Sequence, residues 1–222
     1  MYFKIHKEGW VYFIVSCIGT VISIYLSPIL SIFLFILSIY IFYFFRDPIR
    51  TIPTEDVIVS PADGIITFIG DSDAPNEINV NQKLKKISIF LSIFDVHVNR
   101  APVTGQIKDI HYIDGKFLNA SFDKSSDQNE RNIITFENNK KEIFIVSQIA
   151  GLIARRIVCN IESKQQINKG ERIGIIKFGS RVDLYVPLNY KFLVSLGQRV
   201  VGGETIISNP NKIFEIKTTM KI

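Results

Sequence analysis

The chain has 222 residues, 47% of them hydrophobic, and a formal net charge of +5. This length suits one globular domain with an accessory segment, and its two cysteines, Cys17 and Cys159, are too few and too apolar in setting for a disulfide scaffold or a metal site. The basic residues form no run and no aromatic-interleaved patch, which argues against a nucleic-acid partner and favours an anionic lipid surface.

The apolar residues are concentrated near the N-terminus, where residues 9–45 contain no charged side chain. One straight helix of that length would overshoot a hydrocarbon core of about 30 Å. Pro28 lies near the middle and suits the start of a second helix. The segment therefore predicts two helices, over about 10–26 and 28–45, and fits a secretory signal peptide less well because it is too long.

Basic residues flank this predicted helical hairpin on both sides. Lys4 and Lys7 precede it, and Arg46 and Arg50 follow it, so that a hairpin would bring all four to one side of a membrane. Positive flanks face the cytoplasm. We therefore expect attachment to the cell membrane, with the rest of the chain on the cytoplasmic face, whether the hairpin spans the bilayer or only dips into it.

A short extended linker, 46–53, leads into a region of β-strand patterns. Residues 86–93 alternate cleanly between Ile or Leu and other side chains, which is typical of a half-buried strand. Similar patterns predict further strands over 57–60, 65–69, 106–112, 132–136, 142–149, 155–161, 173–178, 182–186, 199–207 and 212–217. The fold class predicted is mainly β (α+β): a compact barrel-like or sandwich-like domain after a helical hairpin.

Two turns of similar sequence, at 169–174 and 196–201, share a Gly-x-Arg-apolar core that opens a β run. They resemble the strand-turn-strand units of biotinyl and lipoyl carrier domains, although neither carries the modified lysine. A membrane-anchored, carrier-like adaptor without catalysis is therefore one hypothesis, and it requires an intact chain of 25.3 kDa.

A candidate reactive serine stands between two β runs, in Lys177-Phe178-Gly179-Ser180-Arg181. Glycine has no side chain to obstruct the serine hydroxyl, and it tolerates the backbone strain that close approach to its carbonyl demands. This geometry suits a self-cleaving serine, provided that its surroundings activate the hydroxyl. A Gly-Ser pair alone is more often a turn or a strand end.

Few other residues could perform chemistry. His97 follows the alternating strand and can move protons near neutral pH, and we expect Asp95 and Asn99 to share its face. Asp63, in Pro-Ala-Asp-Gly, is either a turn cap or a charge partner in a relay. The histidines and acids lack the short paired spacings of a metal site, so no metal is expected, and a metallopeptidase of barrel fold is disfavoured.

Together these residues resemble the phosphatidylserine decarboxylase proenzymes of the short bacterial type. The resemblance rests on an ordered set of motifs: Ser-Pro-Ala-Asp-Gly at 60–64, Phe-Asp-Val-His-Val-Asn-Arg-Ala-Pro at 94–102, Asp-Gly-Lys-Phe at 114–117, Asn-Ala at 119–120, Asp-Lys-Ser at 123–125, Asn-Glu-Arg at 129–131 and Gly-x-Ile-Lys-Phe-Gly-Ser-Arg-Val-Asp at 174–183. It is clearest over residues 46–187.

The resemblance implies cleavage of the Gly179–Ser180 bond by Ser180 itself, which yields chains 1–179 and 180–222. A pyruvoyl group formed from Ser180 would be the covalent cofactor. The amine of membrane phosphatidylserine would form a Schiff base with it and lose carbon dioxide, giving phosphatidylethanolamine. Residues 1–46 would be the membrane-associating segment and 47–222 the decarboxylase domain, with the two cleaved chains held together.

The resemblance also suggests roles for three residues. His97 is the candidate for proton transfer during decarboxylation, and Asp63 for assisting self-cleavage. Longer members of the family carry a second histidine three positions after the first, where this chain has Arg100, so the pattern does not identify the group that activates Ser180. Arg100 is instead a candidate for contact with the lipid headgroup. A pyruvoyl decarboxylase of another amine is an alternative.

Overall fold

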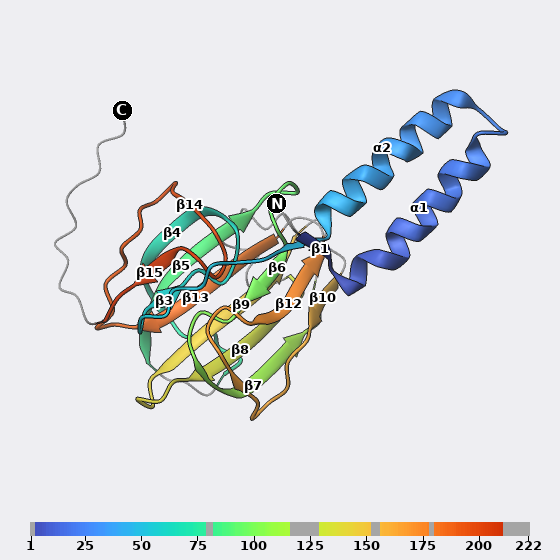
Figure 1. The fold of residues 1–222 in the computed structure, drawn as a ribbon. Helices are drawn as coiled ribbons and strands as arrows, with labels where there is room; N and C mark the ends of the chain where they lie inside the picture. Colours follow the sequence, from blue (N-terminus) through green and yellow to red (C-terminus); the bar gives the residue numbers. More distant parts are fainter. Residues whose placement is uncertain (1–2, 79–81, 116–128, 152–155, 178–179, 211–222) are drawn as a thin grey trace, which may run out of the picture.

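A computed structural model describes residues 3–78, 82–115, 129–151, 156–177 and 180–210 (Figure 1). The elements in chain order are β1 Phe3–Ile5, η1 Lys7–Gly9, α1 Trp10–Ser23, α2 Pro28–Phe44, β2 Arg46–Pro48, β3 Ile58–Val59, β4 Gly64–Asp73, β5 Lys83–Leu91, β6 Val98–Arg100, β7 Gly105–Ile113, β8 Arg131–Glu137, β9 Ile143–Ala150, β10 Arg156–Cys159, β11 Gln166–Ile167, β12 Arg172–Lys177, β13 Ser180–Pro187, β14 Arg199–Val200 and β15 Ile206–Ser208. The prediction of a mainly β fold behind an N-terminal helical hairpin is confirmed.

The domain is built on a curled antiparallel sheet of eight strands, in the order β11-β7-β8-β9-β13-β5-β4-β14 (Figure 1). A second, three-stranded sheet, in the order β10-β12-β6, accompanies it, and two-stranded pairs join β1 to β2 and β15 to β3. β13 lies in the middle of the large sheet, between β9 and β5. The strand that begins at Ser180 is therefore paired along both of its edges.

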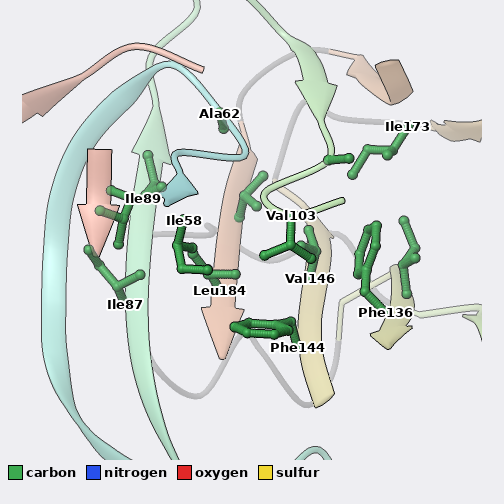
Figure 2. Packing of buried hydrophobic residues seen from close by; sticks show 14 of the residues in the cluster. Ile58, Ala62, Ile87, Ile89, Val103, Phe136, Phe144, Val146, Ile173 and Leu184 are labelled. Carbon is green, nitrogen blue, oxygen red and sulfur yellow. The ribbon is translucent and has the colours of Figure 1, made fainter. Parts of the chain in front are cut away.

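The main core lies on one face of the large sheet. Strict alternation sends Ile87, Ile89 and Leu91 of β5 to this face, where they are fully buried. Leu184 of β13 and Val146 of β9 join them from the neighbouring strands (Figure 2). Each such side chain contributes roughly 1.5–3 kcal/mol through its burial, so the alternating pattern in the sequence fixes which face of each strand turns inward.

The hairpin of α1 and α2 projects away from the β domain (Figure 1). Pro28 occupies the first turn of α2, and the Ser27 hydroxyl accepts a hydrogen bond from the Leu30 amide at 3.5 Å, so this helix begins where the sequence predicts. Hydroxyl groups join the two helices, with Ser23 Oγ donating to Ser31 Oγ at 3.1 Å. Over the residues described, neither helix reaches the combination of length and hydropathy needed to cross a membrane.

The structure corrects two of the predicted segments. The linker 46–53 contains strand β2, whose residue Arg46 lies opposite Ile5, because three residues of the N-terminus fold back to pair with it. The single strand predicted over 199–207 is two short strands, separated by a turn in which Gly203 adopts φ +80°. The strand predicted over 212–217 lies outside the described residues.

Candidate functional site

Ser180 is the first residue of β13 and points to the core face of the large sheet. Alternation places it on the same face as Val182 and Leu184, and its neighbours across the sheet are Leu91 on β5 and Ala150 on β9. Its side chain is fully buried, and its hydroxyl has no hydrogen-bond partner in the described part of the chain. Since buried polar groups are nearly always paired, this hydroxyl is a candidate for chemistry. Gly179, the predicted residue before the cut, lies outside the described residues.

Lys177 ends the strand that leads toward Ser180, and it is held by the start of the N-terminal hairpin. Its Nζ donates to Glu8 Oε2 at 2.8 Å and lies 5.4 Å from the centre of the Tyr12 ring. The Lys177 amine lowers the pKa of the Glu8 carboxyl. The partners are 169 residues apart in sequence, so no local pattern could predict the contact.

His97 is fully buried just before β6, against the end of α2. Its Nδ1 lies 3.0 Å from the Asp95 carbonyl oxygen, and its ring centre lies 4.3 Å from that of Phe44. Burial lowers the pKa of His97 to about 4. With Nδ1 donating its proton to the carbonyl, Nε2 keeps a free lone pair, and this atom has no partner among the described residues. At neutral pH the His97 ring is therefore neutral, with an unprotonated Nε2.

The polar edge expected from Asp95, His97 and Asn99 does not form. β5 ends at Leu91, and the Asp95 carboxylate closes a turn by accepting from the Ser92 amide and hydroxyl, both at 2.8 Å. Because the backbone turns there, Asp95 is not on a strand and its side chain does not follow the alternation assumed from the sequence.

Asn99 belongs instead to a chain of buried amides that the sequence did not reveal. Gln148 Nε2 donates to Asn99 Oδ1 at 2.7 Å, and Asn132 Nδ2 donates to Gln148 Oε1 at 2.9 Å. All three side chains are fully buried. Gln148 lies opposite Val182, which places it one diagonal step from Ser180 on the same face of the sheet. These amides form a polar strip within the apolar core beside the serine.

Asp63 is joined to Arg50 rather than to His97 or Ser180. Arg50 Nη2 donates to both Asp63 oxygens, at 2.9 and 2.7 Å, and the Gly202 amide donates to Oδ1 at 2.8 Å. Burial raises the pKa of Asp63, and the Arg50 charge opposes that rise. No hydrogen bond links Asp63 to His97 or Ser180, all three of which are described. Its part in self-cleavage stays a prediction.

Arg100 is buried in an ion pair with Asp47. Its Nη2 donates to Asp47 Oδ1 at 3.0 Å and to the Pro48 carbonyl at 3.1 Å, and its Nη1 donates to the Gly170 carbonyl at 2.9 Å. The predicted contact with a lipid headgroup stays a prediction, and Arg100 already has these partners within the protein. Within the described ranges, no three His, Cys, Asp or Glu side chains are grouped so as to hold a metal ion.

Comparison with known proteins identifies the family. A family model described as phosphatidylserine decarboxylase matches residues 37–208. The chain is 48% identical to a phosphatidylserine decarboxylase proenzyme of Wolbachia sp. subsp. Brugia malayi (strain TRS), over 94% of this chain and 92% of that protein. It is 50% identical to the proenzyme of Ehrlichia chaffeensis (strain ATCC CRL-10679 / Arkansas), over 92% and 91% of the two chains. It is 48% identical to that of Pelagibacter ubique (strain HTCC1062), over 92% and 96%.

These matches confirm the resemblance drawn from the motifs, and they cover nearly the whole chain, as the motifs predicted. The name proenzyme, which all three relatives carry, refers to a precursor that is processed. Because the family model covers well over half of the residues and the relatives are about half identical, the chain belongs to the phosphatidylserine decarboxylase family of carboxy-lyases.

Proposed function

We propose that this chain cleaves itself between Gly179 and Ser180, makes a pyruvoyl group from Ser180, and uses it to convert phosphatidylserine to phosphatidylethanolamine. The observation that carries the proposal is the Ser180 hydroxyl, which is fully buried and unpaired within the described residues, at the start of the central strand. Membership of a family whose relatives are called proenzymes gives that hydroxyl a reaction to perform.

Self-cleavage begins when the Ser180 oxygen attacks the carbonyl carbon of Gly179. The peptide nitrogen leaves, and residues 1–179 are then held as an ester on Ser180. Loss of the Ser180 α-proton expels the Gly179 carboxylate and leaves dehydroalanine at the new N-terminus. Water hydrolyses this to the pyruvoyl group and releases ammonia. No external oxidant or reductant is consumed.

The surroundings of Ser180 suit the group that this chemistry makes. A pyruvoyl group supplies a ketone that condenses with the substrate amine and accepts the electron pair left by carbon dioxide. Leu91 and Ala150, on either side of Ser180, offer apolar walls without competing nucleophiles, and pairing with both neighbouring strands holds the end of the chain in place. Dry walls of this kind strengthen electrostatic effects and limit side reactions with water.

His97 transfers the proton. Its neutral Nε2 accepts the proton that the substrate nitrogen loses once the neutral amine has added to the ketone. The imidazolium that results then returns a proton to the carbon from which carbon dioxide has left. General acid-base catalysis of this kind contributes typically about 10²- to 10⁴-fold in rate. The low pKa of His97 supports a role that starts from the neutral ring.

Asp63 and Arg100 keep the roles that the family resemblance suggests. We assign Asp63 to assistance of self-cleavage. Its burial raises the pKa of its carboxyl group, which makes proton transfer to and from that group easier near neutral pH. We assign Arg100 to binding of the anionic part of the lipid headgroup. The headgroup would then compete with the Asp47 carboxylate for the Arg100 guanidinium.

Residues 1–46 attach the protein to the cell membrane, and residues 47–222 form the decarboxylase domain on the cytoplasmic face. Exposed apolar side chains along the hairpin support this assignment: Phe33 is 62% exposed and Ile29 is 82% exposed. Apolar patches of this kind mark membrane or protein contacts. A diacyl lipid is scarcely soluble in water, so a domain held at the interface can reach its substrate without extracting it fully.

The test is release of carbon dioxide from carboxyl-labelled phosphatidylserine by wild-type protein, Ser180→Ala and Ser88→Ala. Ser88 is a matched control, because its hydroxyl is also buried and unpaired among the described residues, but it lies on β5 away from the cleavage point. Ser180→Ala should stay uncleaved and inactive, while Ser88→Ala should resemble wild type. Activity in Ser180→Ala would refute the proposal. Activity toward another primary amine, but not toward phosphatidylserine, would establish the alternative substrate class.

A further inference from the structure

The end of the hairpin that meets the β domain differs from the rest of it. Phe44 and Phe45 are fully buried, whereas Phe33 and Phe35 of the same hairpin are 62% and 57% exposed. Phe44 packs with Val96, Val98 and other residues in a small apolar cluster of its own. A segment that served only as a tether would not need to bury its last side chains beside a candidate catalytic residue.

Phe44 covers the ring of His97. The two ring centres lie 4.3 Å apart, with their planes inclined at 34°. Since neither residue has any exposed surface, the aromatic ring keeps water from this side of the imidazole. The charged groups acting on His97 are Asp95 from its own loop and Arg46 from the end of the hairpin.

The same end of α2 also holds the turn that precedes His97. The Tyr40 hydroxyl donates to the Ile93 carbonyl at 3.2 Å, and the Tyr43 hydroxyl donates to the Phe94 carbonyl at 3.2 Å. Arg46 Nη2 donates to that second carbonyl at 2.7 Å. These bonds fix the backbone up to Asp95, whose own carbonyl oxygen orients His97 Nδ1. The orientation of the imidazole is thus tied to the hairpin on two sides.

We propose that the C-terminal end of α2 is part of the active site, with Phe44 as the positioning residue that shields His97 and holds its neutral ring in place. This inference rests on the proposed role of His97 and extends it. The hairpin then has two functions: its exposed length meets the lipid surface, and its buried end prepares the proton-transfer residue.

Replacing Phe44 with a small residue should let water reach His97. The pKa of His97 should then rise from about 4 toward its ordinary value of 6.5, because desolvation is the largest cause of its depression. In mild acid, a smaller fraction of His97 in the variant would then be in the neutral form. Decarboxylation by the variant should therefore be about four- to tenfold slower at pH 5.5 than at pH 7.5, whereas wild-type protein should change little.

The experiment compares Phe44→Ala, Phe44→Leu and Phe68→Ala with wild type in detergent micelles containing phosphatidylserine, where membrane recruitment no longer limits the rate. The pH profile is measured on the cleaved proteins. Phe68→Ala removes the same side chain from β4, where it is half-buried against the Lys86 amine, and should keep the wild-type pH profile. Phe44→Leu, which keeps a large apolar side chain beside His97, should have a pH profile close to that of wild type. In parallel, the His97 ring is titrated by NMR in uncleaved Ser180→Ala protein with and without Phe44→Ala, the signal being assigned through His97→Gln.

An unchanged His97 titration in the Phe44→Ala protein would overturn this inference, as would a Phe68→Ala pH profile shifted as far as that of Phe44→Ala. If Phe44→Ala does not fold, Tyr40→Phe with Tyr43→Phe takes its place, with a smaller shift expected in the same direction; no shift there also overturns the inference. Failure of wild-type protein to decarboxylate phosphatidylserine would instead refute the proposed function, while the titration would still decide whether Phe44 shields His97.

Discussion

Four buried polar atoms without a partner in the described ranges belong to Ser180, to His97 and to the amide strip: Ser180 Oγ, His97 Nε2, Asn99 Nδ2 and Asn132 Oδ1. An unpaired buried polar group costs roughly 1–3 kcal/mol. A reaction of the group is one reason why a protein keeps such a cost, and for Ser180 and His97 the family of the chain supplies that reason. Two of these residues, Ser180 and His97, were predicted from the sequence as reactive.

The buried imidazole makes stability depend on pH in a defined direction. His97 has a pKa of about 4 in the folded protein and 6.5 when unfolded, so between these values the unfolded chain binds a proton that the folded protein does not. The free energy of unfolding therefore falls as the pH is lowered through this range, by on the order of 2–3 kcal/mol at pH 4.5. Urea denaturation of uncleaved Ser180→Ala protein at pH 7 and 4.5 measures the loss.

The control for this prediction is His97→Gln in the same Ser180→Ala background. The other groups that titrate in this range are the same in both proteins. The difference between their losses in the free energy of unfolding therefore measures the contribution of His97. The His97→Gln protein should lose less stability on acidification. Equal losses in the two proteins would show that His97 is not buried in its neutral form.

The chain of buried amides beside Ser180 should stabilise the fold, because its central residue, Gln148, hydrogen-bonds to both Asn99 and Asn132. Gln148→Met would leave Asn99 Oδ1 and Asn132 Nδ2 without their present bonds in a fully buried setting, at a cost of about 2–4 kcal/mol. Gln106→Met, which removes one bond to the Lys164 carbonyl near the surface, should cost less than about 1 kcal/mol. Chemical denaturation measures the free energy of unfolding of both variants. Similar losses in the two would mean that the buried amides contribute little to stability.

At the scale of secondary-structure elements, most correct predictions came from the alternation of apolar residues in strands and from residues typical of a helix start. Ile87, Ile89 and Leu91 predicted a strand and its inward face correctly, and Pro28 predicted the start of α2. Pairings between distant segments could not be predicted this way. β1 consists of three residues with no alternation to detect, and it exists because it pairs with β2 more than forty residues later in the chain.

The ion pair between the hairpin and β12 predicts an asymmetry between its two partners. The Lys177 side chain is 9% exposed and that of Glu8 is 30% exposed. Glu8→Gln leaves a buried amine without an anion and should cost about 1–3 kcal/mol, whereas Lys177→Met leaves a carboxylate that water can reach and should cost less than about 1 kcal/mol. Thermal denaturation of both variants in detergent measures the difference. A larger loss for Lys177→Met would contradict the burial assigned to the amine.

For the whole molecule, the sequence predicted the fold class and the motifs of the family, but not how the two parts meet. The apolar stretch indicated a hairpin, and the motifs around Ser180 and His97 indicated the chemistry. The contacts of Phe44 with His97 and of Glu8 with Lys177 join elements distant in sequence. Such contacts depend on the three-dimensional packing of both parts, and a single sequence carries no local signal for them.

Attachment to lipid should depend on the exposed length of the hairpin. Phe33→Asp with Ile36→Asp places two charges on a surface where these side chains are 62% and 59% exposed. A charge at the centre of a membrane-inserted helix costs about 2.5–3.5 kcal/mol, so sedimentation with anionic vesicles should fall by an order of magnitude or more. Phe33→Leu with Ile36→Leu should bind as wild type does. Undiminished binding of the charged variant would exclude the hairpin as the anchor.

The most direct test of the central claim is the mass of the purified wild-type protein under denaturing conditions. We expect two fragments, residues 1–179 and residues 180–222, of which the smaller has no free amino terminus and forms an adduct with hydroxylamine through its ketone. A single chain of 25.3 kDa with an unmodified serine at position 180 would contradict the account.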